Sequence, residues 1–276
     1  MKKLPVLLAF FLLGSTIYAE GADSSSTGGT SAVRIMESDG LTFLRGAGYI
    51  FSAPARWNGK DWLTFGGSGV GTLAVSGLDV DVRIFMQKRQ TPANNSLATA
   101  AEQYGNGFNM IGLSAGGYIA GLALGDRWIR ETSLLAGSAI VIAGTISTVT
   151  KVLVGRARPY TGDGHLTFRP FSVPLVDVAS FPSGHTIVAF AFSGVLAERI
   201  HNTWASIGLY SLAAACGVSR MYTDEHWVSD VVFGAFISIS VSHTLVRWFE
   251  TGGDPSGESG LRLVPGAQSL TLVWTF

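Results

Sequence analysis

The sequence predicts an all-α fold: a bundle of five to six apolar helices, for which a transmembrane arrangement is one interpretation, with a short β-like tail at the C-terminus. Hydrophobic residues make up 47% of the 276 residues and charged residues only 14%, whereas a typical soluble domain is about 25% charged. Long apolar stretches follow one another between residues 62 and 248. They show little of the polar–apolar alternation expected of strands.

The N-terminal residues have the pattern of an export signal. Two lysines precede an apolar stretch from Leu4 to Leu13, and Ala19 stands at a suitable cleavage position. Because Ile17 replaces the small residue that is usual two positions earlier, an uncleaved N-terminal anchor is the alternative. By either route we expect residues 1–19 to direct the chain to the cell envelope of a bacterium.

Residues 20–60 are predicted to be a linker and an N-terminal extension. Residues 20–32 are rich in Gly, Ser and Thr, which is typical of flexible linkers, and Pro54 breaks the mixed pattern that follows. Residues 251–276 are predicted to be a second linker and a tail. From Leu261 onward the tail alternates as a strand does, and we expect it to pack on the bundle, because one strand cannot form a barrel.

Five apolar stretches can each form a long buried or membrane-spanning helix. They are Phe108–Gly125, Ser133–Thr150, Thr186–Ala197, Trp204–Val218 and Val231–Trp248. Only some of them reach the ~20 residues that a bilayer span needs. A weaker sixth stretch, Trp62–Leu78, contains five glycines, which we expect to allow close helix packing. It lacks the preceding strand and following lysine of a nucleotide-binding loop.

Charge and cysteine content exclude several classes of function. The formal net charge is zero, so no basic surface indicates nucleic acid as a partner. The single cysteine, Cys216, cannot form an internal disulfide, and we interpret it as a small buried hydrophobe. Because no cluster of acidic residues is available to hold a metal, we expect no metal and no other cofactor.

The first of three polar clusters contains Lys151, Arg158 and Pro159. A spacing of seven places both cations on one face of a helix, two turns apart, and Pro159 is predicted to end that helix at Arg158. Two fixed cations at a helix end can bind an anion. The alternative is that they only interact favourably with the helix dipole.

The second cluster is Phe181-Pro182-Ser183-Gly184-His185, and it precedes an apolar stretch. It predicts a turn that opens a helix near His185. Free backbone N–H groups at a helix start form a natural phosphate site, to which Ser183 adds a hydroxyl and Gly184 a close backbone approach. The alternative is an ordinary N-cap serine followed by an incidental histidine.

The third cluster contains Arg220, His226 and Asp230. His226 and Asp230 are four residues apart and are predicted to be neighbours on a helix face, where the carboxylate would fix the tautomer of the ring and stabilise its cation. Arg220 can meet His226 only if the chain bends between them. The alternative is a surface pair at a helix start.

Taken together, the clusters supply the groups that in-line phosphoryl transfer needs, namely cations, a hydroxyl, a nucleophile and an acid. They resemble the three motifs of the type-2 phosphatidic acid phosphatase superfamily, which includes vanadium-dependent haloperoxidases and bacterial acid phosphatases. The motifs are Lys-x6-Arg-Pro, Pro-Ser-Gly-His and Ser-Arg-x5-His-x3-Asp, and residues 151–230 match every defined position. We therefore interpret residues 61–250 as a phosphatase helical domain.

The resemblance implies a cradle for the substrate phosphate. In it Lys151, Arg158 and Arg220 bind phosphate oxygens, and Ser183 and the backbone of Gly184 complete the site. The implied partner is a phosphate monoester, and the apolar chain favours a lipid phosphate and contact with a membrane. The sequence gives no indication of the oligomeric state.

The resemblance also implies the catalytic roles. His226 attacks phosphorus, and Asp230 holds the His226 ring in place. His185 protonates the leaving alkoxide and then activates water to hydrolyse the phosphohistidine. The residues alone leave open which histidine is the nucleophile. The neighbouring carboxylate favours His226, because the ring becomes positive after attack.

Other functions remain as alternatives. They are a periplasmic acid phosphatase that acts on soluble monoesters, a vanadium haloperoxidase, and a lipid-binding protein that is not an enzyme. The orientation is also open. If the signal is cleaved and all six stretches span, the loop with Lys151 is cytoplasmic. If the N-terminal segment stays as an anchor and Trp62–Leu78 does not span, the loop lies outside. If no stretch spans, the whole enzyme is periplasmic. Related membrane enzymes keep the site on the outer face, so we predict that it faces the periplasm.

Overall fold

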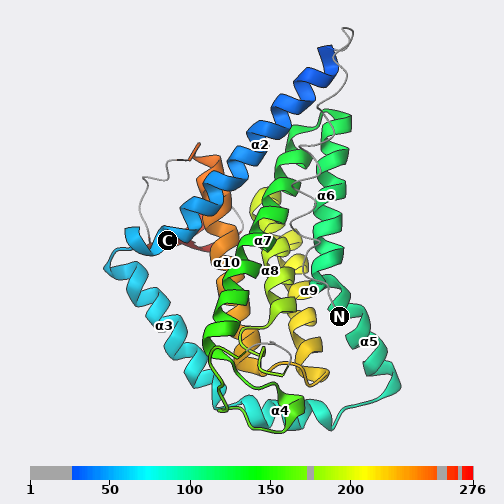
Figure 1. The fold of residues 1–276 in the computed structure, drawn as a ribbon, viewed down its shortest axis with the longest axis vertical. Helices are drawn as coiled ribbons and strands as arrows, with labels where there is room; N and C mark the ends of the chain where they lie inside the picture. Colours follow the sequence, from blue (N-terminus) through cyan, green and yellow to red (C-terminus); the bar gives the residue numbers. More distant parts are fainter. Residues whose placement is uncertain (1–26, 173–176, 254–259, 267–268, 276) are drawn as a thin grey trace. The chain divides into compact units, whose positions relative to one another are not determined.

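The computed structural model describes residues 27–172, 177–253, 260–266 and 269–275. Nine α-helices lie within these ranges, which confirms the all-α bundle (Figure 1). They are α2 (Thr27–Phe51), α3 (Gly59–Ser76), α4 (Asp79–Gln87), α5 (Pro92–Glu102), α6 (Gly107–Leu124), α7 (Arg127–Val154), α8 (Gly184–Ile200), α9 (Thr203–Tyr222) and α10 (Val228–Glu250). Three short 3-10 helices are η1 (Ala53–Arg56), η2 (Gln103–Gly105) and η3 (Pro159–Thr161).

Each of the six apolar stretches forms the body of one helix. The stretches correspond, in chain order, to α3, α6, α7, α8, α9 and α10. Helices α2, α4 and α5 are additions that the apolar pattern did not predict, and α2 begins at Thr27, inside the stretch expected to be a linker. The predicted signal peptide or anchor, residues 1–19, lies outside the described residues.

The C-terminal tail contains two strands where one was expected. Strand β1 (Gly260–Gly266) pairs antiparallel with β2 (Ser269–Thr275), so that Gly260 lies opposite Thr275 and Gly266 opposite Ser269. Alternation along a sequence marks extended chain, but it does not mark where that chain reverses.

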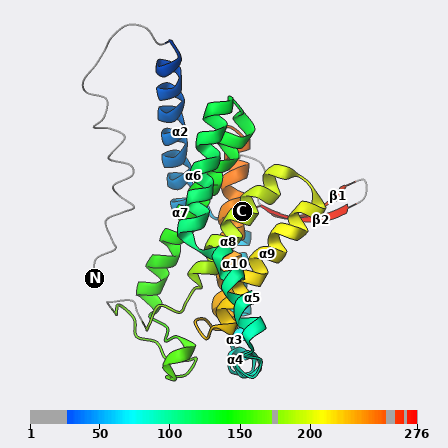
Figure 2. The ribbon, with the colours of Figure 1, turned by 90° about the vertical axis from the view of Figure 1, so that its right-hand side faces the viewer.

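The core lies between α7, α8 and α10, which pack against one another. Helix α6 packs on α7, and α9 packs on α8 with α5 at its side (Figure 2). Because α7 to α10 follow one another up and down the bundle, the C-terminal ends of α7 and α9 and the N-terminal ends of α8 and α10 share one end. Helix α4 lies at this same end (Figure 1). The buried core side chains include Leu135, Ile142, Ile187, Val195 and Leu245.

Helix α7 ends earlier than the sequence predicted. It begins at the N-cap Asp126, whose carboxylate accepts the N–H of Ile129 at 2.9 Å, and it ends at Val154 because Gly155 adopts a left-handed φ of +58°. The prediction that Pro159 ends the helix is wrong. Lys151 lies in the last turn and Arg158 in the loop that follows, so the two cations do not share a helix face.

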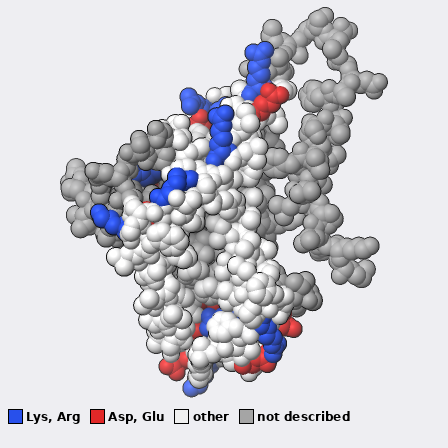
Figure 3. Space-filling view, turned by 60° about the vertical axis from the view of Figure 1, so that its left-hand side comes forward, with Lys and Arg blue, Asp and Glu red and all other residues white. Residues whose placement is uncertain are grey.

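The described residues have the features of a membrane protein. Helices α6, α7 and α10 are long and apolar enough to cross a membrane. Large apolar side chains are exposed elsewhere in the bundle, including Leu63 on α3 and Trp204 on α9. On the face in Figure 3, charged side chains gather toward the two ends, and a broad uncharged band lies between them.

The glycines of α3 do not pack against another helix. A Cβ built on Gly66, Gly67, Gly69 or Gly71 would meet no atom within 4 Å. The prediction that these residues allow close helix packing is therefore wrong, because this part of α3 faces open space in the structure.

Replacing Gly155 with alanine should destabilise the fold. A side chain at this left-handed position would overlap the Arg169 carbonyl oxygen, and the backbone conformation alone costs about 1–2 kcal/mol for a residue with a Cβ. We expect Gly155→Ala to lower the Tm of the purified chain in detergent by about 4 °C or more. Gly144→Ala is the matched control, because Gly144 lies within α7 beside open space. Equal Tm values for the two variants would contradict this account.

Candidate functional site

The three polar clusters meet at the end of the bundle that carries α4. Lys151 lies in the last turn of α7, Ser183 precedes α8, Arg220 lies in the last turn of α9 and His226 precedes α10. The N–H of Ser183 donates to the backbone carbonyl of Asp230 at 3.1 Å, which ties the start of α8 to the start of α10.

Lys151 secures the turn before α8. Its ammonium donates to the carbonyl oxygens of Ala179 and Pro182, both at 2.6 Å. Its side chain also passes beside Gly184, where a Cβ would lie 4.0 Å from the lysine Cε. A positive charge therefore lies next to the first N–H groups of α8, which have no partner within the helix.

The two predicted arginines hold buried donors that lack an acceptor. The chain bends after α9 and brings Arg220 to Glu225, which also pairs with Arg158. Arg220 pairs in addition with Glu102, at 2.5 Å. Among the described residues, the Nε–H groups of Arg158 and Arg220 are buried without a hydrogen-bond partner. Unpaired buried donors on cations favour the binding of an anion.

The second cluster begins α8 as predicted. Ser183 is the N-cap residue and is fully buried, and its Oγ accepts a hydrogen bond from the Thr186 hydroxyl at 2.9 Å. His185 follows in the first turn. Burial is the largest cause that lowers the pKa of His185 to about 4, and the charges of Arg220, Arg158 and Lys151 contribute in the same direction.

His226 carries its proton on Nδ1. This nitrogen lies 2.7 Å from the Ser180 carbonyl oxygen, which can only accept a hydrogen bond, so Nδ1 donates and Nε2 keeps a free lone pair. Burial is the main cause that lowers the pKa of His226 to about 4, so the ring is neutral at pH 7. A buried neutral imidazole with a free Nε2 is a competent nucleophile.

Asp230 lies within ion-pair distance of His226, but the separation is too long for a hydrogen bond. His226 precedes α10, which begins at Val228, so the two residues are not neighbours on a helix, and the Nδ1–Oδ2 distance is 3.7 Å. Asp230 Oδ2 instead accepts the Ser180 hydroxyl at 2.5 Å and the Trp227 N–H at 2.8 Å. The Asp230 carboxylate therefore fixes two segments of chain next to the His226 ring, one at Ser180 and one at Trp227.

Two residues that support this arrangement were not predicted from the sequence. Arg156 binds Asp230 at 2.5 Å and Asp79 at 2.6 Å, and all three side chains are buried. Arg156 stands at an undefined position of the first motif, and Asp79 directly follows the apolar stretch 62–78. An acidic residue directly at the end of an apolar stretch was a signal that could have drawn attention to Asp79.

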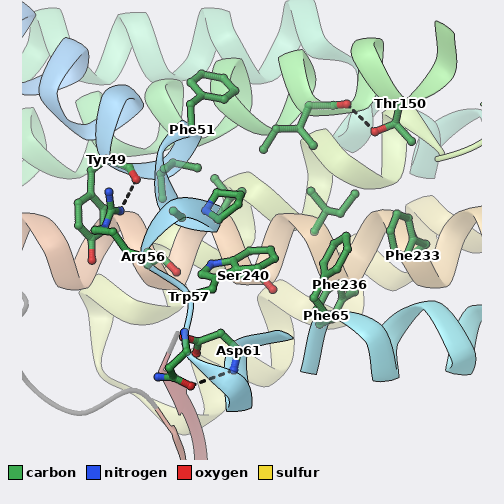
Figure 4. A pocket seen from close by; sticks show the side chains of 18 of the residues that line it. Tyr49, Phe51, Arg56, Trp57, Asp61, Phe65, Thr150, Phe233, Phe236 and Ser240 are labelled. Atoms are coloured by element: carbon green, nitrogen blue, oxygen red, sulfur yellow. Dashed lines mark hydrogen bonds between the residues drawn. The ribbon is translucent and has the colours of Figure 1, made fainter. Parts of the chain in front are cut away.

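A largely apolar pocket of about 720 Å³ lies between α2, η1, α3, α7 and α10 (Figure 4). Phe233 and Phe236 lie toward one end of the view, and Tyr49 and Arg56 toward the other. Its lining includes Thr150 and Phe181, which are the chain neighbours of Lys151 and Pro182. The pocket thus adjoins the segments that carry the site.

Comparisons with known proteins find a family model that matches part of the chain. The model of the PAP2 superfamily matches residues 132–254, which contain all three motifs. Lipid A 1-phosphatase of Porphyromonas gingivalis is 41% identical over 64 residues, 22% of this chain and 14% of that protein. Bacitracin transport permease protein BcrC of Bacillus licheniformis is 30% identical over 139 residues, 48% of this chain and 64% of that protein. The chain spans less than two thirds of either relative.

Two solved structures align with the chain. A transmembrane PAP2 type phosphatidylglycerolphosphate phosphatase from Bacillus subtilis aligns with a TM-score of 0.50 at 21% identity, over 78% of this chain and 95% of that one. LpxE from Aquifex aeolicus aligns with a TM-score of 0.47 at 21% identity, over 62% of this chain and 95% of that one. The first alignment supports the helical arrangement described above.

The neutral state of His226 should make the fold sensitive to acid. Its pKa of about 4 in the folded chain lies below the 6.5 of a free histidine, so the unfolded state binds more protons between these values. Stability should fall as the pH drops from 6.5 toward 4, by up to about 1.4 kcal/mol per pH unit. We expect His226→Asn, which cannot be protonated but keeps a donor for Ser180, to show a flatter dependence of Tm on pH. Parallel curves for the two proteins would disprove this assignment.

Proposed function

We propose that this chain, whose residues 132–254 belong to the PAP2 superfamily, hydrolyses phosphate monoesters of lipids through a phosphohistidine formed on His226. One observation carries the proposal. The unpartnered Nε–H groups of Arg158 and Arg220 lie buried in the same site as a neutral histidine whose Nε2 is free. A tetrahedral anion is the ligand that such a set of groups recognises.

The cations supply the binding step. A phosphate dianion would replace the Glu225 carboxylate, which now pairs with Arg158 and lies 3.7 Å from Arg220. Lys151 and the first N–H groups of α8, beside Ser183 and Gly184, complete the cradle. These charges neutralise the phosphate and favour the charge distribution of the transition state.

The histidines supply the chemistry in two steps. In the first, Nε2 of His226 forms a bond to phosphorus while the ester P–O bond breaks, and protonated His185 gives its proton to the leaving alkoxide. The bound dianion offsets the neighbouring cations and so raises the pKa of His185 for this role. In the second, neutral His185 takes a proton from water, and the water oxygen forms a bond to phosphorus while the P–N bond breaks. The electron pair of that bond returns to Nε2 of His226, and phosphate leaves.

Three observations support a lipid as the substrate. The apolar pocket adjoins the site, helices α6, α7 and α10 are apolar enough to cross a membrane, and one relative is a lipid A 1-phosphatase. An acyl chain in the pocket would lie beside Phe181 and Phe233, whose rings stack at 4.8 Å. Soluble monoesters have no comparable need for such a surface.

Trapping the phosphoenzyme distinguishes the roles of the two histidines. The purified chain would be mixed with ³²P-labelled p-nitrophenyl phosphate, quenched in alkali and tested for acid-labile label. We expect His226→Ala to carry no label and to lose turnover by about 10³-fold or more. His185→Ala should accumulate label, because p-nitrophenolate leaves without a proton but water is no longer activated. Label or wild-type turnover in His226→Ala would refute the nucleophile.

The site should face the periplasm. The two ends of α10 lie about 34 Å apart, so Leu166, near the site, and Thr251, after α10, report on opposite sides of the bundle. Native Cys216 is fully buried. In spheroplasts we expect a membrane-impermeant maleimide to label Leu166→Cys and to spare Thr251→Cys until the membrane is opened. The reverse pattern would place the site in the cytoplasm.

A further inference from the structure

We propose that Asp79 and Arg156 are positioning residues that fix Asp230 and, through Ser180, set the orientation of the His226 ring. This inference rests on the proposed function, in which His226 is the nucleophile. Neither residue belongs to the defined motif positions, and Asp79 lies outside the part of the chain that matches the family.

Arg156 is an enclosed ionic link between two carboxylates. Only 3% of its side chain is exposed, and both Asp79 and Asp230 are fully enclosed. Its Nη1 donates to Asp230 Oδ1 at 2.5 Å, and its Nη2 donates to Asp79 Oδ2 at 2.6 Å. The guanidinium also donates twice to the His165 carbonyl oxygen. A planar fork with this many partners has one geometry available to it.

Asp79 is secured in turn by the start of α10. Its carboxylate accepts the backbone N–H of Ser229 at 3.0 Å and the Ser229 hydroxyl at 2.9 Å. The same hydroxyl accepts a hydrogen bond from Arg156 at 2.8 Å. Helix α4 makes a second connection one turn later, where Arg83 binds Asp224 through two hydrogen bonds of 2.7 Å. Helix α4 thus contacts the chain both before His226, at Asp224, and after it, at Ser229.

Ser180 connects this network of hydrogen bonds to the His226 ring. Its carbonyl accepts the Nδ1–H of His226, its hydroxyl donates to Asp230, and its N–H donates to the Arg156 backbone carbonyl at 3.1 Å. Both the backbone and the side chain of Ser180 therefore depend on Arg156. If Asp230 moved, the acceptor that selects the His226 tautomer would move with it.

Charge gives the same network a second effect. Two carboxylates and one guanidinium leave the group with a net charge of −1, buried where electrostatic interactions are strong. Phosphorylation turns the ring of His226 positive, and Lys151 and Arg158 oppose that charge. Because Asp230 is already neutralised by Arg156, the carboxylate of Asp79 supplies the additional negative charge that offsets Lys151 and Arg158.

The test compares variants of the full chain in detergent with a lipid phosphate as substrate. We expect Asp79→Asn and Arg156→Lys to lower kcat by about 10- to 100-fold, as for other residues that orient a reacting group. KM and the affinity for inorganic phosphate should stay within about 3-fold, because the cradle is untouched. Ser229→Ala is a milder variant, with an expected loss of about 3- to 10-fold.

Asp39→Asn is the matched control. Asp39 is a buried carboxylate that accepts from Tyr118 and pairs with Arg130, which lies about 30 Å from Lys151 along α7. We expect it to lower stability without changing kcat. The inference fails if Asp79→Asn turns over at the wild-type rate, or if it loses phosphate affinity in step with kcat.

A spectroscopic measurement separates this inference from the proposed function. In ¹⁵N-histidine-labelled wild type, His226 should show one neutral tautomer with the proton on Nδ1. Asp79→Asn and Arg156→Lys should show a mixture of tautomers, and Asp39→Asn should not. A wild type that hydrolyses no monoester ends the proposed function, whereas unchanged tautomers in all variants overturn the positioning role.

Discussion

The two salt bridges that Arg156 makes with Asp79 and Asp230 are the interaction on which the rest of the site depends. An ion buried in a bundle of apolar helices is stable only if its charge and all its donors find partners. Arg156 meets this condition by linking the loop after α7, the start of α4 and the start of α10. The segments that carry the proposed reacting groups are thereby joined through one side chain.

The helix ends explain why a polar site can exist in so apolar a chain. The bodies of α7, α8 and α10 bury aliphatic side chains against one another, and the termini collect the charged residues. Two of these termini are helix starts, at Ser183 and Trp227, where backbone N–H groups are free to bind anions or carboxylates. Asp230 uses one such start, because it accepts the Trp227 N–H, and we propose that the substrate phosphate uses the other.

The local motifs could be recognised without a structure, but their supporting contacts could not. Ser183, Gly184 and His185 are consecutive, and the helix they open was predicted at the right place. Asp79 and Arg156 are 77 residues apart, and Ser180 and Asp230 are 50 apart. No local spacing reports contacts of this kind. The same limit explains the error at α7, where the left-handed Gly155 ended the helix before the proline did.

The sequence by itself determined the helical class, the positions of the apolar helices and the identity of the residues proposed to bind phosphate, since each of these follows from local composition or spacing. The tertiary structure alone decided that Ser180, and not Asp230, accepts the proton of His226, and that Asp79 belongs to the site. The reason is physical: the tautomer of a buried ring and the pairing of a buried charge depend on which distant groups the packed helices bring within hydrogen-bond distance.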